Sequence, residues 1–193
     1  ALLPILLTKR KPPTFKKIKS MSLKELYSSS PLGMVSSIFY GTIQSALFTL
    51  LAVYAAAMNF SIFDISLVTF MLGISGAISQ YPIGYISDTF DRRKVIIYST
   101  FGAAIFALFA IFSGGTMYLP EGLGSSKFWF YFFLIAFSMC SLPMFSLILA
   151  HTNDFITRDK FVAAGASLQF AFGLGAISGP FLCSLFMDLV GNN

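Results

Sequence analysis

The chain has 193 residues, of which 56% are hydrophobic and 11% are charged, and its net charge is +5. A soluble domain normally has roughly a quarter of its residues charged, so the composition excludes an ordinary soluble enzyme or binding domain. The basic excess does not indicate a nucleic-acid partner, because the basic residues lie beside long apolar runs. A secretory signal followed by a soluble domain is also excluded, since apolar runs recur along the whole chain.

The N-terminal part of the chain precedes the first full apolar run. Residues 1–7 are apolar but too few to cross a bilayer, and we interpret them as the tail of a preceding transmembrane helix. Residues 8–30 are predicted to form a basic cytoplasmic linker. Within it, Ser22 and Glu25 have the spacing of a capping box, which predicts a short helix lying at the inner membrane surface.

The rest of the chain, 31–193, is predicted to be a transmembrane bundle. A helix needs about 20 apolar residues to cross the hydrocarbon core, where the backbone has to satisfy its own hydrogen bonds. The sequence therefore predicts an all-α membrane protein, a helical bundle of about five transmembrane helices. These spans run about 34–58, 65–86, 95–112, 128–149 and 161–187.

The distribution of basic residues predicts the orientation of the bundle. Twelve of the 13 lysines and arginines lie before the first span, after the second or after the fourth. The remaining one, Lys127, precedes the fourth span. Because basic loops stay on the cytoplasmic side, residues 8–30 and 87–94 are predicted to be cytoplasmic, in a multi-pass protein of the plasma (inner) membrane. The basic balance also predicts attraction to anionic lipid.

A charged loop between the second and third spans is the strongest functional signal. A topology signal alone is enough to explain Arg92, Arg93 and Lys94. It does not explain Asp88, because an acidic residue at the C-terminal end of a helix opposes the helix dipole. It is suited to dock on the positive N-terminus of a neighbouring helix and to release when the helices part. The predicted gating motif consists of Gly84, Asp88, Asp91, Arg92, Arg93 and Lys94.

The last span contains Gly175, Gly179 and Pro180. The Gly-x-x-x-Gly spacing lets two helix backbones approach closely, and proline permits a bend. Close helix packing is the simpler interpretation. A bend that helps to seal a cavity is the functional one, and the residue types alone do not separate the two.

Polar residues on one face of the first span predict a cavity lining, because polar groups in lipid normally turn inward. The second span contributes Gln80, and interhelical hydrogen bonding explains its amide as well as ligand contact does. No carboxylate, lysine or arginine lies near the middle of a span, which argues against a strongly charged substrate or a proton relay in this part. The possible substrate cavity consists of Ser37, Tyr40, Gly41, Gln44, Phe48 and Gln80.

The other polar residues carry weaker signals. Asp64 follows Ser61 with the spacing of a capping box, and a cap is favoured over a proton carrier. His151 and Asp154 follow the fourth span, where a solvated or capping role is favoured over metal binding or titration. No nucleophile motif, phosphate-binding loop or metal-ligand spacing occurs. We therefore expect no enzyme activity, no cofactor and no metal.

The charged loop also carries a family resemblance. Gly84, Asp88, Arg92, Arg93 and Lys94 resemble the signature loop between the second and third helices of each half of a major facilitator superfamily transporter. Thr89 and Asp91 depart from that pattern, where a basic residue and a glycine are usual. Such departures are typical of the second half. The amino-acid sequence of residues 31–94 and 150–191 is most similar to that of the YcaD-like bacterial permeases.

The resemblance implies a fold and a function. The spans correspond to helices 7–11 of a twelve-helix fold, with the last helix missing. The implied function is secondary active transport of a small, neutral or amphipathic organic solute by alternating access, with 84–94 as the cytoplasmic latch. The implied partners are the lipid bilayer, the solute and the missing N-terminal half of the same polypeptide, which would hold the helix that Asp88 docks on. The alternative is a non-transporting receptor, scaffold or lipid-interacting protein that retains the fold.

Overall fold

The computed structural model describes residues 20–57, 60–114 and 126–191. The predicted helix tail at 1–7 and the linker residues 8–19 lie outside the described residues. The described part is helical, and its element order is α2 (Leu23–Ser29), α3 (Pro31–Ala57), α4 (Ile62–Thr89), α5 (Arg92–Gly114), α6 (Ser126–Ser141), α7 (Met144–Asn153), a 3₁₀ turn (Arg158–Lys160) and α8 (Phe161–Gly191).

Five segments of the described chain are long and apolar enough to cross a membrane, judged by length and composition. They coincide with the five predicted spans and confirm an all-α membrane protein. The helices extend a few residues beyond the apolar runs because polar residues cap them. The hydroxyl of Ser61 accepts the amide of Asp64, and the carboxylate of Asp64 accepts the amide of Ser61. The capping role predicted for Asp64 is therefore confirmed.

The fourth span differs from the continuous helix that the sequence analysis predicted. It consists of α6 and α7, which meet at Leu142 and Pro143. Proline has no amide hydrogen and its ring collides with the carbonyl four residues earlier, so it breaks the helical hydrogen-bond ladder. The break is buried: the Pro143 side chain is among those fully enclosed. Leu142 contacts Gly76 of α4, where any larger side chain would meet it.

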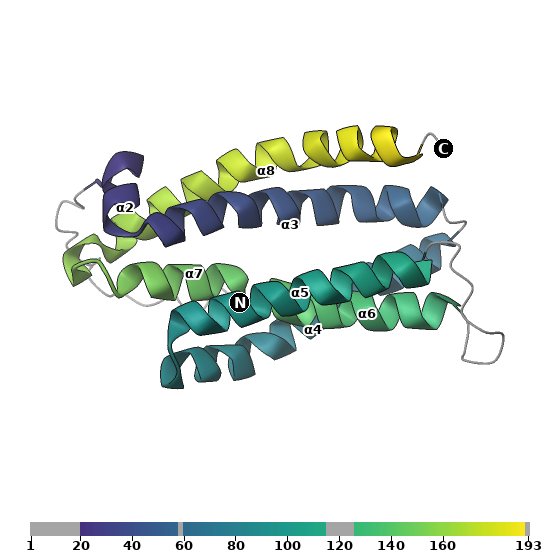
Figure 1. Ribbon diagram of the computed structural model, residues 1–193, viewed down its shortest axis with the longest axis horizontal. Coiled ribbons are helices and arrows are strands. Elements are labelled where there is room, and N and C mark those ends of the chain that lie inside the picture. The colour runs from purple at the N-terminus through teal and green to yellow at the C-terminus, as the bar shows by residue number, and fades with distance from the viewer. Residues whose placement is uncertain (1–19, 58–59, 115–125, 192–193) are drawn as a thin grey trace, which may run out of the picture.

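The helices pack around two apolar clusters. Helices α3 and α8 lie side by side along most of their length, and α5 lies along α6 (Figure 1). One cluster joins α2, α3, α5, α7 and α8 and includes the fully buried Ile148 and Leu168. The other joins α4, α5 and α6 around Leu72 and Phe137. Many large apolar side chains elsewhere are exposed, as expected of helices that face lipid or another part of a membrane protein.

The short helix α2 packs onto the end of the bundle where α8 begins (Figure 1). Ser22 caps it by accepting the amide of Glu25. The carboxylate of Glu25 does not return to Ser22 as a complete capping box would; it pairs with Lys160, with Nζ and Oε1 2.5 Å apart. Leu26 is fully buried beneath the helix. The helix predicted at the membrane surface is thus fastened to the bundle by one buried leucine and one ion pair.

Replacing Leu26 by alanine is expected to loosen α2 from the bundle. Removal of a fully buried leucine costs about 2–5 kcal/mol, which exceeds what an isolated helix of this length can supply. Hydrogen exchange of the α2 amides should therefore become much faster. Tyr27→Ala, one residue along and 53% exposed, is the matched control and should change exchange little. Equal protection in both variants would contradict the anchoring role.

Candidate functional site

The turn between α4 and α5 is built by Asp91. Helix α4 ends where the amide of Phe90 donates to the carbonyl of Ile86. Asp91 then accepts the backbone amide of Arg93 through its carboxylate, at 3.0 Å, directly before α5 begins. Aspartate is a favoured residue at this capping position. The departure from the family glycine therefore has a local explanation, which is that the carboxylate closes the turn and caps α5.

Arg92 connects three helices at this end of the bundle. Its Nη2 donates to Oδ1 of Asp88, one helical turn earlier at the end of α4, at 2.9 Å. Its Nη1 donates to Oδ1 of Asp154, directly after α7, at 3.1 Å. The planar guanidinium holds its donors in a fixed fork, so one arginine can bridge two carboxylates. We call Asp88, Arg92 and Asp154 the bridge triad.

The bridge triad is partly open to solvent. The Arg92 side chain is 25% exposed, whereas those of Asp154 and Asp88 are 49% and 71% exposed. Ion pairs with such exposure contribute about 0.2–1 kcal/mol each. Each contact can therefore bias an equilibrium between two arrangements of the helices only modestly.

Arg93 and His151 each contact the ring of Phe155, beside the bridge triad. The guanidinium of Arg93 lies 5.4 Å from the centre of the Phe155 ring, in a cation–π arrangement. The ring of His151 packs against the same Phe155 ring, with the two ring centroids 5.0 Å apart. His151 is 3% exposed, so the solvated alternative predicted for it is wrong. Its carbonyl takes part in the cap of α7, where it accepts the amide of Asp154. The aromatic ring of Phe155 covers the imidazole.

The other members of the predicted gating motif have few neighbours in the described chain. Lys94 is exposed. A Cβ atom added to Gly84 would meet nothing within 4 Å in the described part of the chain. Helix packing within this bundle therefore does not require glycine at this position. The membership of Gly84 in the gating motif remains a prediction.

The predicted cavity residues of α3 divide into two groups. Ser37 and Gly41 lie in the contact between α3 and α8: the hydroxyl of Ser37 donates to the carbonyl of Leu168 at 2.8 Å. A Cβ atom at Gly41 would lie 2.1 Å from the carbonyl oxygen of Phe172. These two positions bring the helices together.

Tyr40 and Gln44 form the second group and point elsewhere in the bundle. The hydroxyl of Tyr40 donates to the carbonyl of Leu142 at the break in the fourth span, at 3.2 Å. Its ring packs on Phe145 and Phe172. Gln44 is 9% exposed, and its Oε1 has no hydrogen-bond partner among the described residues. Buried polar atoms are normally paired, so Gln44 is the member of the set with an unused acceptor.

Phe48 and Gln80 are exposed on different helices, α3 and α4. The structure does not bring Gln80 into contact with the α3 residues through any hydrogen bond between described residues. Their membership in one cavity remains a prediction.

The contact between α3 and α8, which we call the glycine seam, contains Gly41, Gly175 and Gly179. A Cβ atom at Gly175 would lie 1.9 Å from the carbonyl oxygen of Ile38, and one at Gly179 would lie 2.3 Å from that of Thr42. At this separation the hydroxyl of Thr42 lies 3.1 Å from the carbonyl oxygen of Gly175. Pro180 lies within α8, which continues on both sides of it.

Sequence analysis missed three residues that organise these contacts. Asp154 caps α7, as one of the two predicted roles had it, but the sequence did not predict that its carboxylate is the second acceptor of Arg92. The sequence feature that could have indicated this pairing is the predicted position of Asp154 on the same side of the membrane as the charged loop. Pro143 was visible within an apolar run but was treated as part of a continuous helix. Thr42 gave no separate signal, because threonine is common in transmembrane helices.

The described residues contain no group of three or more histidine, cysteine or acidic side chains that could hold a metal ion. Cys140 and Cys183 are unpaired and partly buried. The described polar residues of the candidate site instead make ion pairs and hydrogen bonds between helices.

Comparisons with known proteins agree with this architecture. The family model described as Major Facilitator Superfamily matches residues 4–192. Similar curated proteins include the uncharacterized MFS-type transporters YE1530 of Yersinia enterocolitica, 25% identical over 86% of this chain and 40% of its own length, and YfkF of Bacillus subtilis, 24% identical over 86% and 41%. The MFS-type transporter YcaD of Escherichia fergusonii is 21% identical over 100% of this chain and 47% of its own length. The chain thus spans less than half the length of these relatives. No solved structure shows a significant match to it.

Proposed function

Because this chain belongs to the major facilitator superfamily, we propose that it is the second-half bundle of a secondary transporter. The protein would move a small organic solute across a membrane by alternating access, with the 84–94 loop as the latch on the cytoplasmic side. The names of the relatives as MFS-type transporters support transport over a scaffold role. The spans would correspond to helices 7–11 of the family fold.

The observation that carries the latch proposal is the bridge triad. Arg92 ties the end of α4 to the end of α7 through two carboxylates. A pure topology signal needs only positive charge and no particular partner. Asp88 retains much exposed surface beside this pair, so it can also reach the positive end of a helix in the other half. Gly84, with open space where its side chain would be, would let that helix approach closely.

The solute site is proposed beside Tyr40 and Gln44. Gln44 has the unused acceptor, and Tyr40 lies at the break of the fourth span, where helix geometry is irregular. Transporter sites often lie where helices are interrupted near the midplane. The spans hold no central charged side chain, which favours a neutral or amphipathic solute.

The proposed location is the plasma (inner) membrane, with residues 8–30 and 87–94 on the cytoplasmic side. The bundle end that carries α2, the charged turn and the start of α8 would then face the cytoplasm. The lipid bilayer, the solute and the first half of the same polypeptide are the proposed partners.

Asp88→Asn in the full-length protein tests the latch. A screen of labelled neutral and amphipathic organic solutes with membrane vesicles first identifies one whose accumulation depends on the protein. Asparagine keeps the shape of the side chain but removes the charge, so it weakens both the pair with Arg92 and any contact with a helix N-terminus. Transport of that solute is expected to fall about tenfold, which corresponds to a loss of ~1.4 kcal/mol.

The matched control is Asp159→Asn, which removes one carboxylate from the same end of the bundle outside the bridge triad. It should leave transport close to that of the parent protein. Equal transport by the parent and by Asp88→Asn, at equal amounts of protein in the membrane, would refute the latch.

A further inference from the structure

The fourth span changes its packing partners halfway. Its first part, α6, packs with α4 and α5 around Leu134 and Phe137. Its second part, α7, packs with α2, α3, α8 and the start of α5 around Ile148, which is fully buried. Figure 1 shows α6 beside α5, whereas α7 lies at the end of the bundle that carries α2. The two parts of this span therefore belong to different packed groups.

A proline breaks the span where its partners change. Pro82 and Pro180 also lie within spans, but α4 and α8 continue past them. Pro143 instead separates α6 from α7. Because proline removes a backbone hydrogen bond from a helix, the chain at Pro143 lacks the continuous ladder that stiffens the helices on either side of it.

Side chains of two other helices hold the break in position. The hydroxyl of Tyr40 on α3 donates to the carbonyl of Leu142 at 3.2 Å. The Tyr40 ring stacks on Phe145, in the first turn of α7, with the two ring centroids 6.2 Å apart. The side chain of Leu142 lies against Gly76 of α4, where an added Cβ atom would come within 2.1 Å of it. The break is thus held from both packed groups, beside the proposed solute site at Tyr40.

An ion pair ties the far end of α7 to the other packed group. Helix α7 has 10 residues, so it is about 15 Å long. Asp154, directly after it, pairs with Arg92 at the start of α5 at 3.1 Å, and Arg92 also holds Asp88 at the end of α4. Exposed ion pairs are weak, so this tie can open without disrupting the apolar packing of either group.

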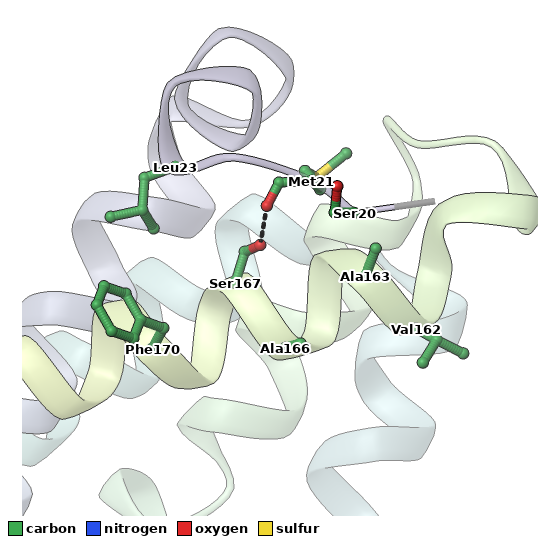
Figure 2. A pocket seen from close by; sticks show the side chains of 8 residues that line it. All are labelled: Ser20, Met21, Leu23, Val162, Ala163, Ala166, Ser167 and Phe170. Atoms are coloured by element: carbon green, nitrogen blue, oxygen red, sulfur yellow. Dashed lines mark hydrogen bonds between the residues drawn. The ribbon is translucent and has the colours of Figure 1, made fainter. Parts of the chain in front are cut away.

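Helices α2 and α8 belong to the same packed group as α7. A cavity of about 440 Å³ lies between the chain entering α2 and the first part of α8, and the hydroxyl of Ser167 donates to the carbonyl of Met21 at 2.7 Å beside it (Figure 2). The carboxylate of Glu25 pairs with Lys160, directly before α8. Helix α8 in turn packs on α3 along the glycine seam. A movement of α7 would therefore carry α2, α3 and α8 with it.

We propose that Leu142 and Pro143 form a hinge inside this bundle. The group of α2, α3, α7 and α8 turns about the hinge against the group of α4, α5 and α6. The pair of Arg92 and Asp154 holds the two groups together at the end of the bundle that carries the charged turn. Hinges of this kind use a few residues at the ends of elements to absorb backbone rotation. The bundle thus flexes within itself, and this property goes beyond the proposed transport and does not depend on the solute.

Distances between spin labels test the hinge in the full-length protein in lipid nanodiscs, without solute. Cys140 and Cys183 are first replaced by alanine. One label is placed at Thr157, after α7, and the other at Ile97 of α5, which is 60% exposed. Asp154→Asn removes the tie and is expected to raise the ratio of long to short distances by up to about fivefold, which corresponds to the ~1 kcal/mol of an exposed ion pair.

A matched pair of proline variants locates the movement. Pro143→Ala restores a backbone amide and favours one continuous helix, so in the Asp154→Asn protein it should return the ratio to that of the parent. Pro82→Ala makes the same change inside the continuous helix α4 and should leave the effect of Asp154→Asn intact. A second label pair, at the exposed Phe70 of α4 and Phe101 of α5, lies within one group and should keep its distance in every variant.

Three results would overturn the hinge. Unchanged distances between Thr157 and Ile97 in Asp154→Asn would show that the ion pair does not hold two movable groups together. Equal suppression by Pro143→Ala and Pro82→Ala would show a general effect of proline removal. An equal change in the second label pair would show that the whole bundle loosens and that no single group turns.

Discussion

Gly175→Ala is expected to destabilise the bundle by roughly 2 kcal/mol or more, whereas Gly173→Ala is expected to be neutral or slightly stabilising. At position 175 the new Cβ atom would lie 1.9 Å from the backbone carbonyl oxygen of Ile38, and backbone has no rotamer with which to move away. Overpacking of this kind costs about 1–3 kcal/mol. If the new methyl group pushes α3 and α8 apart, the hydrogen bond from the Thr42 hydroxyl to the carbonyl of Gly175 is also weakened. Hydrogen bonds between helices of a membrane bundle contribute about 0.6 kcal/mol each.

Gly173 supplies the control because the chemical change and the helix are the same. A Cβ atom there would meet nothing within 4 Å in the described part of the chain. Alanine also favours the helix interior over glycine by about 0.5–1 kcal/mol. Thermal unfolding of the purified full-length proteins in detergent should separate the two variants clearly. Equal midpoints would show that α3 and α8 are not packed backbone to backbone.

Arg92→Gln is expected to lower transport about tenfold, and Lys94→Gln to lower it much less. Arg92 holds two carboxylates from different helices, and each exposed pair is worth up to ~1 kcal/mol. Loss of both would shift a two-state equilibrium by up to about 30-fold. Lys94 carries the same charge two residues later and is exposed.

The comparison separates a latch from a topology signal, since a topology signal depends on the number of positive charges. Both variants lose one charge, so that explanation predicts equal effects. Arg92→Lys adds a test of geometry: it keeps the charge but lacks the planar fork, and we expect transport between those of the parent and Arg92→Gln. Solute accumulation in vesicles, corrected for protein amount, is the measurement. Full activity of Arg92→Lys would contradict the need for a bridging guanidinium.

Much of the fold can be predicted from the sequence because a segment that crosses hydrocarbon has to be a helix of about 20 mostly apolar residues. Each span is recognisable from its length and apolar composition, and the boundaries differ from the predicted ones by a few residues, for example where Ser61 caps α4. The exception is the break at Pro143. Proline in a transmembrane helix is tolerated when neighbouring groups satisfy the freed backbone, so its presence alone does not reveal whether a helix bends or ends.

The candidate site was less predictable. The charged loop was recognisable because five charges lie together in a chain with few of them. Its partner Asp154 lies 62 positions from Arg92, and no local pattern connects them. Ser37 and Gln44 lie on the same face of α3 by helical spacing. Even so, Ser37 donates a hydrogen bond to α8, whereas the Oε1 of Gln44 has no partner among the described residues. Helical periodicity assigns a face, but it does not say which neighbour that face meets.

The sequence by itself determined that this is a helical membrane protein, which segments cross, and that the 84–94 loop is its most chemically informative part. The cost of placing charge or unpaired backbone in hydrocarbon makes these features visible without a neighbour. Only the tertiary structure decided that Arg92 bridges Asp88 and Asp154, that Gly175 sits against the backbone of α3, and that α2 closes a cavity on α8. These depend on distances between segments far apart in the chain, which are set by how helices pack.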